Sequence, residues 1–215
     1  MKALVVALAA LSPCTRVVSA DNDSASLHVY WEWDGERHDF SSYPYVGKEL
    51  EEKKTVASIG NIWTSASWSY YDGDARANVT YDMLTAADQG HDTSSGDFGL
   101  IIWLARAGEV YPIGDSVSLA YLDGIECEIF DGFNGDMHVF SYVAPLEQPI
   151  RDSQGDLRVF FDHITDNNSF PADEQHLLIQ WIDVWEENST NDEHAVLQFG
   201  TEPFLGNPAI FTVSD

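Results

Sequence analysis

The 215-residue sequence has little positive charge. It contains 10 Lys and Arg against 36 Asp and Glu, and its formal net charge at pH 7 is −26. We expect no nucleic-acid partner, because a protein that binds phosphate groups needs a basic face. The same charge opposes adhesion to an anionic membrane, and no apolar run is long enough to cross one.

Cysteine and the common catalytic motifs are also scarce. The two cysteines, Cys14 and Cys127, cannot form a framework of several disulfides. The sequence has no phosphate-binding loop, dinucleotide-binding fingerprint, serine elbow or clustered metal ligands, and its seven histidines are scattered. We therefore expect no cofactor and no metal. The sequence also has no repeat, low-complexity segment or linker, which indicates a single domain.

Residues 1–20 have the pattern of a secretory signal peptide. Lys2 is the positive start, residues 3–11 form a short apolar stretch, and Val18-Ser19-Ala20 is a small-residue cleavage site. The sequence therefore predicts a secreted, extracellular protein with a mature domain of residues 21–215. Cleavage would remove Lys2 and Arg16 and no acid, which lowers the formal net charge from −26 to −28. We expect the remaining thiol, Cys127, to be buried.

Many short strands separated by Gly, Asp and Asn turns predict an all-β sandwich. The central strand covers 98–104, and large apolar residues form one of its faces. Asp97, Gly99, Ile101 and Trp103 form the other face, as expected where a strand packs a core on one side and lines a cleft on the other.

Three local signals predict further elements. Asp123-Gly124 is a strong hairpin turn between two short strands. Pro44 interrupts a short strand at 43–46 and favours an edge position. One helix is predicted at about 155–167, where Ser153 and Asp156 resemble a capping box before an apolar stripe.

Carboxylates in aromatic surroundings are the remaining candidates for chemistry. Aromatic residues make up 13% of the chain, and Trp and Tyr rings can stack on sugars as well as pack a core. Glu202 lies in the segment Gly200-Thr201-Glu202-Pro203-Phe204, and Asp82 lies on the polar face of another predicted strand. Cleavage of a glycosidic bond needs two such acids. Surface charge is the competing interpretation for any single acid among 36.

Several segments, in order along the chain, resemble glycoside hydrolase family 12, and especially its fungal xyloglucan-specific members. These segments are Ala66-Ser67-Trp68-Ser69-Tyr70, Val79-Thr80-Tyr81-Asp82-Met83-Leu84, Ile102-Trp103-Leu104-Ala105-Arg106, Tyr111-Pro112-Ile113-Gly114, Asp131-Gly132-Phe133-Asn134-Gly135-Asp136-Met137-His138-Val139-Phe140-Ser141, Phe170-Pro171-Ala172-Asp173-Glu174-Gln175 and Phe199-Gly200-Thr201-Glu202-Pro203-Phe204. The resemblance implies a β-jelly-roll with a concave cleft and retaining endo-hydrolysis of β-1,4-glucan, most of all xyloglucan. Expected partners are plant cell-wall polysaccharide and plant inhibitor proteins, and a monomer is expected.

The resemblance also implies roles for individual residues. Glu202 matches the general acid/base, and Asp82 matches the aspartate that supports the nucleophile. Gly99 stands where the family has its nucleophilic Glu, which leaves that position without a carboxylate. The substrate cleft is assigned Trp103, Trp31, Trp68, Ile101 and Met137, of which Ile101 replaces a Met of the family pattern.

The chain departs from the family pattern in three further places. The first family segment has no counterpart between Ala20 and Leu27, Cys127 replaces an aromatic residue, and residues 181–194 look like an insertion in a strand that is usually continuous. Translated intron sequence would explain the insertion. The sequence therefore leaves two functions open: a hydrolase with impaired catalysis, and a non-catalytic β-glucan binder or decoy for an inhibitor. Sequons at Asn22, Asn78, Asn167 and Asn188 are potential N-glycosylation sites.

Overall fold

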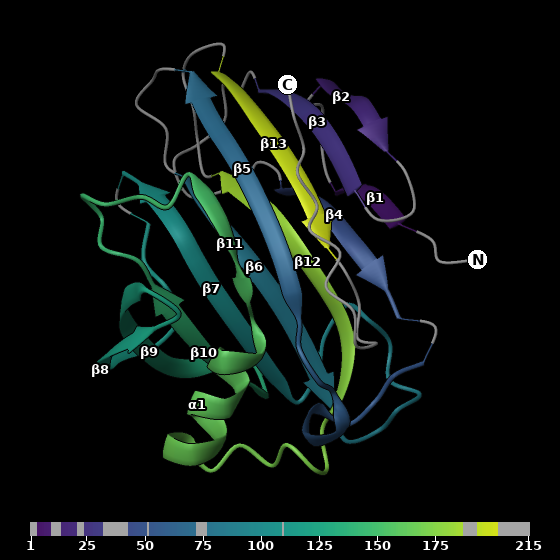
Figure 1. Ribbon diagram of the computed structural model, residues 1–215, viewed down its shortest axis with the longest axis vertical. Coiled ribbons are helices and arrows are strands. Elements are labelled where there is room, and N and C mark those ends of the chain that lie inside the picture. Colours follow the sequence, from purple (N-terminus) through teal and green to yellow (C-terminus); the bar gives the residue numbers. More distant parts are fainter. Residues whose placement is uncertain are drawn as a thin grey trace.

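The computed structural model describes residues 4–9, 14–20, 24–31, 43–50, 52–71, 77–108, 110–186 and 193–201. Side chains are described for residues 50, 52–68, 78–108 and 110–179. The described chain forms two β-sheets, with sheet B in front of sheet A in Figure 1 and a single α-helix beside them. This arrangement confirms the predicted two-sheet sandwich. Within these residues no helix is long and apolar enough to cross a membrane.

Sheet A contains the central strand predicted from the sequence. Its strands lie in the order β1-β4-β12-β6-β7-β10-β9-β8. They are β1 Leu4–Ala9, β4 Tyr43–Glu49, β12 His176–Glu186, β6 Ala77–Ala86, β7 Phe98–Ala107, β10 Met137–Val143, β9 Ile125–Asn134 and β8 Asp115–Leu122. Neighbouring strands are antiparallel except β7 and β10, which are parallel.

Sheet B is smaller and wholly antiparallel, with the order β11-β5-β13-β3-β2. Its strands are β11 Asp152–Asp156, β5 Trp63–Tyr71, β13 Glu193–Thr201, β3 Ser24–Trp31 and β2 Cys14–Ala20. A short 3₁₀ helix, η1 Val56–Ser58, precedes β5. The helix α1, Arg158–Asn168, follows β11.

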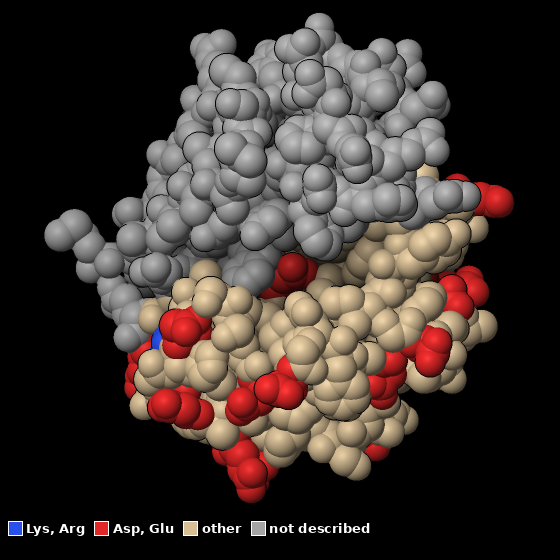
Figure 2. Space-filling view, turned by 180° about the vertical axis from the view of Figure 1, so that it is seen from behind, with Lys and Arg blue, Asp and Glu red and all other residues tan. Residues whose placement is uncertain are grey.

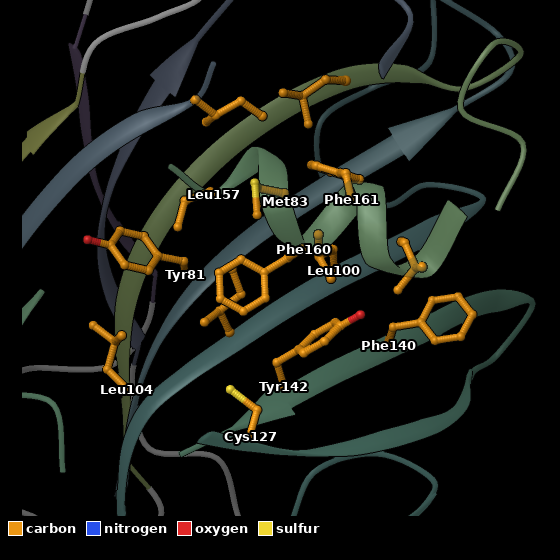
Figure 3. Close-up of a cluster of buried hydrophobic side chains, with 14 of the residues drawn as sticks. Tyr81, Met83, Leu100, Leu104, Cys127, Phe140, Tyr142, Leu157, Phe160 and Phe161 are labelled. Atoms are coloured by element: carbon orange, nitrogen blue, oxygen red, sulfur yellow. The ribbon is translucent and has the colours of Figure 1, made fainter. Parts of the chain in front are cut away.

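The hydrophobic core contains apolar side chains of sheet A, sheet B and α1. Figure 3 labels members of this core from sheet A and from the helix. Leu100, Ile102 and Leu104 of β7 are each 1% exposed, which confirms that this face of the strand packs the core. Full burial of each such side chain stabilises the fold by about 1.5–3 kcal/mol. Because successive strand residues point to opposite faces, the intervening residues of β7 lie on the outer face of sheet A.

Cys127 is a buried residue of this core. It is 1% exposed and free, as predicted. Burial, with a smaller effect of nearby Glu126, raises the pKa of its thiol to about 12, so the reactive thiolate is disfavoured.

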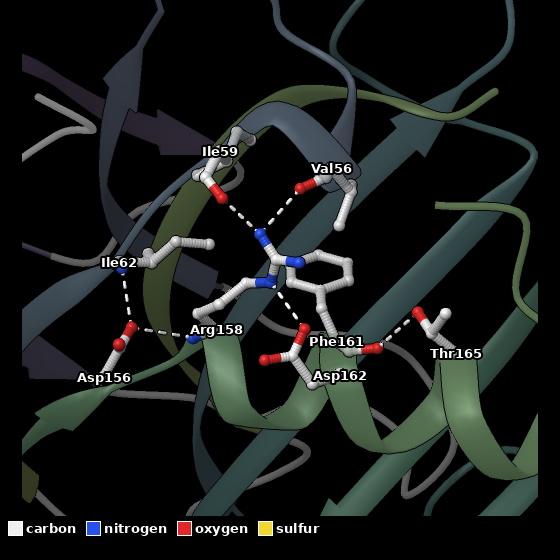
Figure 4. A network of polar contacts seen from close by, with 8 residues as sticks. All are labelled: Val56, Ile59, Ile62, Asp156, Arg158, Phe161, Asp162 and Thr165. Carbon is white, nitrogen blue, oxygen red and sulfur yellow. Dashed lines mark hydrogen bonds and ion pairs between the residues drawn. The ribbon is translucent and has the colours of Figure 1, made fainter. Parts of the chain in front are cut away.

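The beginning of α1 is fixed by Asp156 and not by the predicted capping box (Figure 4). Ser153 lies in β11, and its Oγ is 3.1 Å from the Tyr81 hydroxyl. Asp156 Oδ1 accepts hydrogen bonds from the backbone N–H groups of Ile62 at 2.6 Å and Arg158 at 3.0 Å. The helix therefore starts at Arg158, three residues later than predicted.

Arg158 then joins α1 to η1 (Figure 4). Its Nε donates to Asp162 at 2.8 Å, and its Nη1 donates to the backbone oxygens of Val56, at 2.8 Å, and Ile59. These bonds satisfy carbonyl groups at a turn that precedes β5.

Two predictions near the N-terminus are affected by strand pairing. The strand containing Pro44 is not an edge strand, because β4 lies between β1 and β12. Strands β1 and β2 fall inside residues 1–20 and pair with β4 and β3 as the outermost strands of their sheets. Cleavage after Ala20 stays a prediction, and it would leave β3 and β4 at the sheet edges.

Candidate active site

The outer face of sheet A brings together most of the described candidate residues. On β6, Asp82 is directly opposite Ile101 of β7, and the adjacent pair on the same face is Leu84 opposite Gly99. On the other side of β7, β10 places Ser141 opposite Ile101 and Val143 opposite Trp103. The predicted association of Asp82 with the outer face of the central strand therefore has a structural basis in this register.

Asp82 is half-buried on this face. Figure 2 shows the described part of the molecule from behind. Across the described surface acidic side chains are frequent and basic ones are rare, so the face suits neutral hydroxyl-bearing ligands better than anions.

Gly99 is buried, and its surroundings are apolar. A Cβ atom at this position would lie 3.6 Å from the nearest side-chain carbons of Leu84, Met137 and Val139. That distance is ordinary van der Waals contact, so the backbone leaves room for the first atom of a larger side chain. Such a side chain would leave β7 on the same face as Asp82.

Asp97 is held by other contacts and does not supply a carboxylate at the Gly99 position. Its Oδ2 accepts the backbone N–H of Ala87 at 2.7 Å and the Nε2 of Gln175 at 3.1 Å. The hydrogen bond from Ala87 is the main reason that the pKa of Asp97 is below its ordinary value. The side chain therefore fastens the loop after β6, and it is not directed to the position of Gly99.

Trp103 is an almost fully buried part of the outer face, with 6% of its surface exposed. It packs with Val110 and Val143, and partly buried Ile101 and Phe130 lie against this cluster. Its indole Nε1–H is buried and has no hydrogen-bond partner among the described residues. Buried donors without partners are uncommon and often face a water or a ligand.

Ser141 is a further polar residue on the outer face, which sequence reasoning did not assign to the site. It is 0% exposed, and its Oγ has no partner within the described part of the chain. It pairs with Ile101 on one side and with Phe130 on the other. The signal was a single hydroxyl between Val139 and Val143 on the same face of β10.

Met137 lies at the start of β10, and its Cε would contact a Cβ at position 99. It is half-buried and pairs with Asn134. Met137 therefore lies beside the Gly99 position, and Ile101 and Trp103 are the next two residues on the same face of β7. Their assignment to a cleft stays a prediction.

The assignment of Trp68 to the cleft is wrong. Trp68 belongs to β5 of sheet B, is 6% exposed and is part of the core between the sheets. Its Nε1 donates to Ile150 O at 2.7 Å, and the Arg151 guanidinium carbon is 5.1 Å from the centre of its ring. Trp31 ends β3, also in sheet B, and its side chain lies outside those described.

Glu202 lies outside the described residues. The strand that precedes it, β13, ends at Thr201 and belongs to sheet B, between β5 and β3. The neighbour of β6 in sheet A, on the side away from β7, is β12 and not β13. Trp181 of β12 pairs with Asp82. Residues 181–186 of the predicted insertion thus continue β12 without a break.

The sequons differ in accessibility. Asn78 is 7% exposed and lies in β6, between β12 and β7. An N-glycan on this side chain would force the neighbouring strands of sheet A apart. The assignment of Asn78 as a glycosylation site is therefore not supported. Asn167 is exposed on the last turn of α1, where its Nδ2 donates to His163 O at 2.8 Å. Asn188 lies outside the described residues.

The fold and this face define a class of protein. Two stacked β-sheets, with Asp82 and Trp103 on the outer face of the larger sheet, form a β-jelly-roll. No group of three His, Cys, Asp or Glu side chains among the described residues could hold a metal ion.

Comparison with known proteins identifies the family. Residues 9–215 match the family model "Glycosyl hydrolase family 12", and the chain belongs to this family. The match begins inside residues 1–20. Endoglucanase A of Aspergillus kawachii is 38% identical over 208 residues, which cover 95% of this chain and 79% of that protein. The xyloglucan-specific endo-β-1,4-glucanase A of Aspergillus niger is 30% identical over 207 residues, covering 95% and 76%.

Solved structures agree with the family. The catalytic domain of Humicola grisea Cel12A, in complex with a soaked thio-cellotetraose, has a TM-score of 0.83 at 35% identity and covers 88% of this chain and 84% of its own. Endoglucanase 3 of Trichoderma harzianum, from the same family, has a TM-score of 0.82 at 35% identity, covering 87% and 82%. These likenesses confirm the resemblance and the β-jelly-roll expected from the sequence.

Proposed function

We propose that this chain binds the β-1,4-glucan backbone of xyloglucan or a related plant cell-wall glucan along the outer face of sheet A, and that its hydrolysis of internal bonds is impaired. The proposal is carried by Gly99. It lies on the outer face beside the Asp82 strand, with Leu84, Met137 and Val139 around the position where a side chain would begin.

The retaining mechanism explains why this position matters. One carboxyl group protonates the leaving oxygen, and a second, about 5–5.5 Å away, attacks the sugar and forms a covalent intermediate. In this chain the first role would fall to Glu202, with Asp82 holding the nucleophile. Without the nucleophile we expect a rate loss of several orders of magnitude, on the order of 5 kcal/mol in the barrier.

The test measures binding and hydrolysis separately. We expect the parent chain to bind xyloglucan in affinity electrophoresis and to release almost no reducing sugar. Gly99→Glu should release more reducing sugar than the parent, and Gly99→Gln, which has the same shape without a nucleophilic carboxylate, should not. If Gly99→Glu gains nothing over Gly99→Gln, the missing nucleophile is not the only defect and hydrolysis is not restored at this position.

A second candidate function is a non-catalytic β-glucan binder or a decoy for a plant inhibitor protein. Gly99 favours it, because the outer face keeps Asp82 and Met137 around a position that has no carboxylate. Retained xyloglucan binding, with no reducing sugar from the parent or from Gly99→Glu, would favour this function. Absence of binding by either chain would exclude both candidates.

We also propose that the protein is secreted, monomeric and N-glycosylated at Asn167. Asn167 is exposed at the end of α1 and is followed by Asn168 and Ser169, which complete its sequon. Expression in a fungal host should deliver the chain to the medium and add a glycan that a glycosidase removes. Loss of this mass shift in Asn167→Gln is expected, and a persisting shift would assign the glycan elsewhere.

A further inference from the structure

The edge strand of sheet A carries apolar side chains that the core does not use. Leu119 and Tyr121 of β8 are 72% and 73% exposed. On β9 they are opposite Glu128 and Glu126, while the alternate residue Ala120 is opposite buried Cys127. Leu119 and Tyr121 therefore lie on the outer face of sheet A, and we call this pair the β8 platform.

The β8 platform is continuous with the candidate cleft. Trp103 of β7 is opposite Val143 of β10, Val143 is opposite Glu128 of β9, and Glu128 is opposite Leu119. Three strand spacings separate Trp103 from Leu119, which is roughly 14 Å. Tyr121 is the next residue on that face, so an extended chain leaving Trp103 across the strands would reach the platform.

The packing of the fold does not require these side chains. Edge strands are often protected by charged residues. Although the chain contains 36 Asp and Glu, the edge strand β8 has Leu119 and Tyr121 at these two exposed positions. Exposed Leu and Tyr at an edge give little burial energy in the free protein, whereas contiguous exposed apolar surface commonly marks a binding site. Their side chains are expected to gain contacts only when a ligand covers them.

The surrounding charge favours a neutral carbohydrate. Glu126 is exposed and Glu128 is half-buried beside the platform, and Ser116 Oγ donates to Glu128 Oε1 at 2.5 Å, which orients that carboxylate. Carboxylates accept hydrogen bonds from sugar hydroxyl groups, while an aromatic ring covers the apolar face of a sugar. A second copy of this chain, with net charge −26, would bring like charges together at this face.

We propose that the β8 platform is an additional sugar-binding subsite. In it, Tyr121 stacks on a glucose unit beyond Trp103, and Glu128 accepts a hydrogen bond from a hydroxyl group of that unit. This inference rests on the proposed binding of β-1,4-glucan to the outer face of sheet A. It adds a residue, Tyr121, that selects longer chains over shorter ones.

The experiment measures the affinity of the full chain for cello-oligosaccharides of increasing length and for xyloglucan by calorimetry. Tyr121→Ala should weaken binding of the longer ligands by about three- to tenfold and leave the shorter ones unchanged. Tyr121→Phe, which keeps the ring, should bind like the parent. Phe133→Ala is the matched control, because Phe133 is 63% exposed on β9 but stacks on His138 on the opposite face of the sheet.

Each other outcome overturns the inference in a distinguishable way. If the parent binds no glucan of any length, the proposed function fails and the subsite fails with it. If the parent binds glucan and Tyr121→Ala binds ligands of every length as tightly as the parent does, the proposed function stands and the subsite is refuted. If Tyr121→Ala changes only the oligomeric state in sedimentation, the platform is a contact between copies of the chain.

Discussion

Replacement of Gly99 by alanine tests whether position 99 is an unfilled space. A methyl group there would lie 3.6 Å from carbons of Leu84, Met137 and Val139, at ordinary contact distance. Gly99 is not among the described glycines with positive φ, so the backbone accepts alanine. We therefore expect Gly99→Ala to stabilise the protein.

The magnitude follows from two contributions. Loss of glycine's freedom in the unfolded chain is worth about 0.4–1 kcal/mol, and burial of a methyl group is worth about 0.8 kcal/mol. Because the two are not fully additive, we expect about 1–1.5 kcal/mol. For a domain of this size that raises Tm by about 3–5 °C.

The test compares the free energy of unfolding and the Tm of the parent, Gly99→Ala and Gly96→Ala, measured by urea and thermal unfolding. Gly96 lies three residues earlier, and a Cβ there would be 2.5 Å from the backbone oxygen of Thr85. This variant should lose about 1–3 kcal/mol through overpacking. If Gly99→Ala loses as much stability as Gly96→Ala, the space at position 99 is not available and the reasoning on Gly99→Glu also fails.

Two further substitutions test the polar contacts of the fold. Asp156→Ala removes the acceptor of the Ile62 and Arg158 backbone N–H groups and should cost about 2–4 kcal/mol in urea unfolding; a loss below about 0.5 kcal/mol would contradict the role given to Asp156. The pKa of Asp97 is lowered in the folded protein, chiefly by the hydrogen bond from Ala87. The ionised carboxylate therefore stabilises the fold above the pKa of the unfolded chain, about 3.9. This stabilisation is lost as the pH falls through the lowered pKa of the folded state. In Asp97→Asn the free energy of unfolding should therefore fall less steeply below pH 4 than in the parent, and equal slopes would show that Asp97 does not contribute.

Local patterns were sufficient for much of the fold. Alternation over 98–104 predicted β7 and its buried face, because one side of that strand packs a core. Asp123-Gly124 predicted the hairpin of β8 and β9, and both residues have positive φ, at 49° and 81°. The helix was found from its apolar stripe, although the sequence could not show that Asp156 and not Ser153 would meet its first N–H groups.

Position within the sandwich was harder to predict. Alternation assigned Trp68 to a face of its strand but could not show that this face is turned toward the core between the sheets. Asn78 matches a surface sequon by its letters, yet pairing of β6 with β12 and β7 buries it. The position of Pro44 inside sheet A depends on β1, which is far from β4 in sequence order but adjacent in space. These outcomes are decided by long-range pairing, which local patterns do not encode.

The proposed loss of hydrolysis involves two positions, residue 99 and Glu202, and one bears on the other. Asp82 is opposite Ile101 and lies on the same face as Gly99, so a carboxylate introduced at residue 99 would leave the sheet on the side of Asp82. On the other side of Asp82 the partner strand is β12, which continues through residues 181–186, whereas β13 joins sheet B. Residues 181–186, which the sequence assigned to an insertion, thus pair directly with β6. Gly99→Glu supplies a carboxylate but moves no strand, so a gain in reducing sugar over Gly99→Gln would indicate that Glu202 acts at the outer face of sheet A, as the proposed mechanism requires.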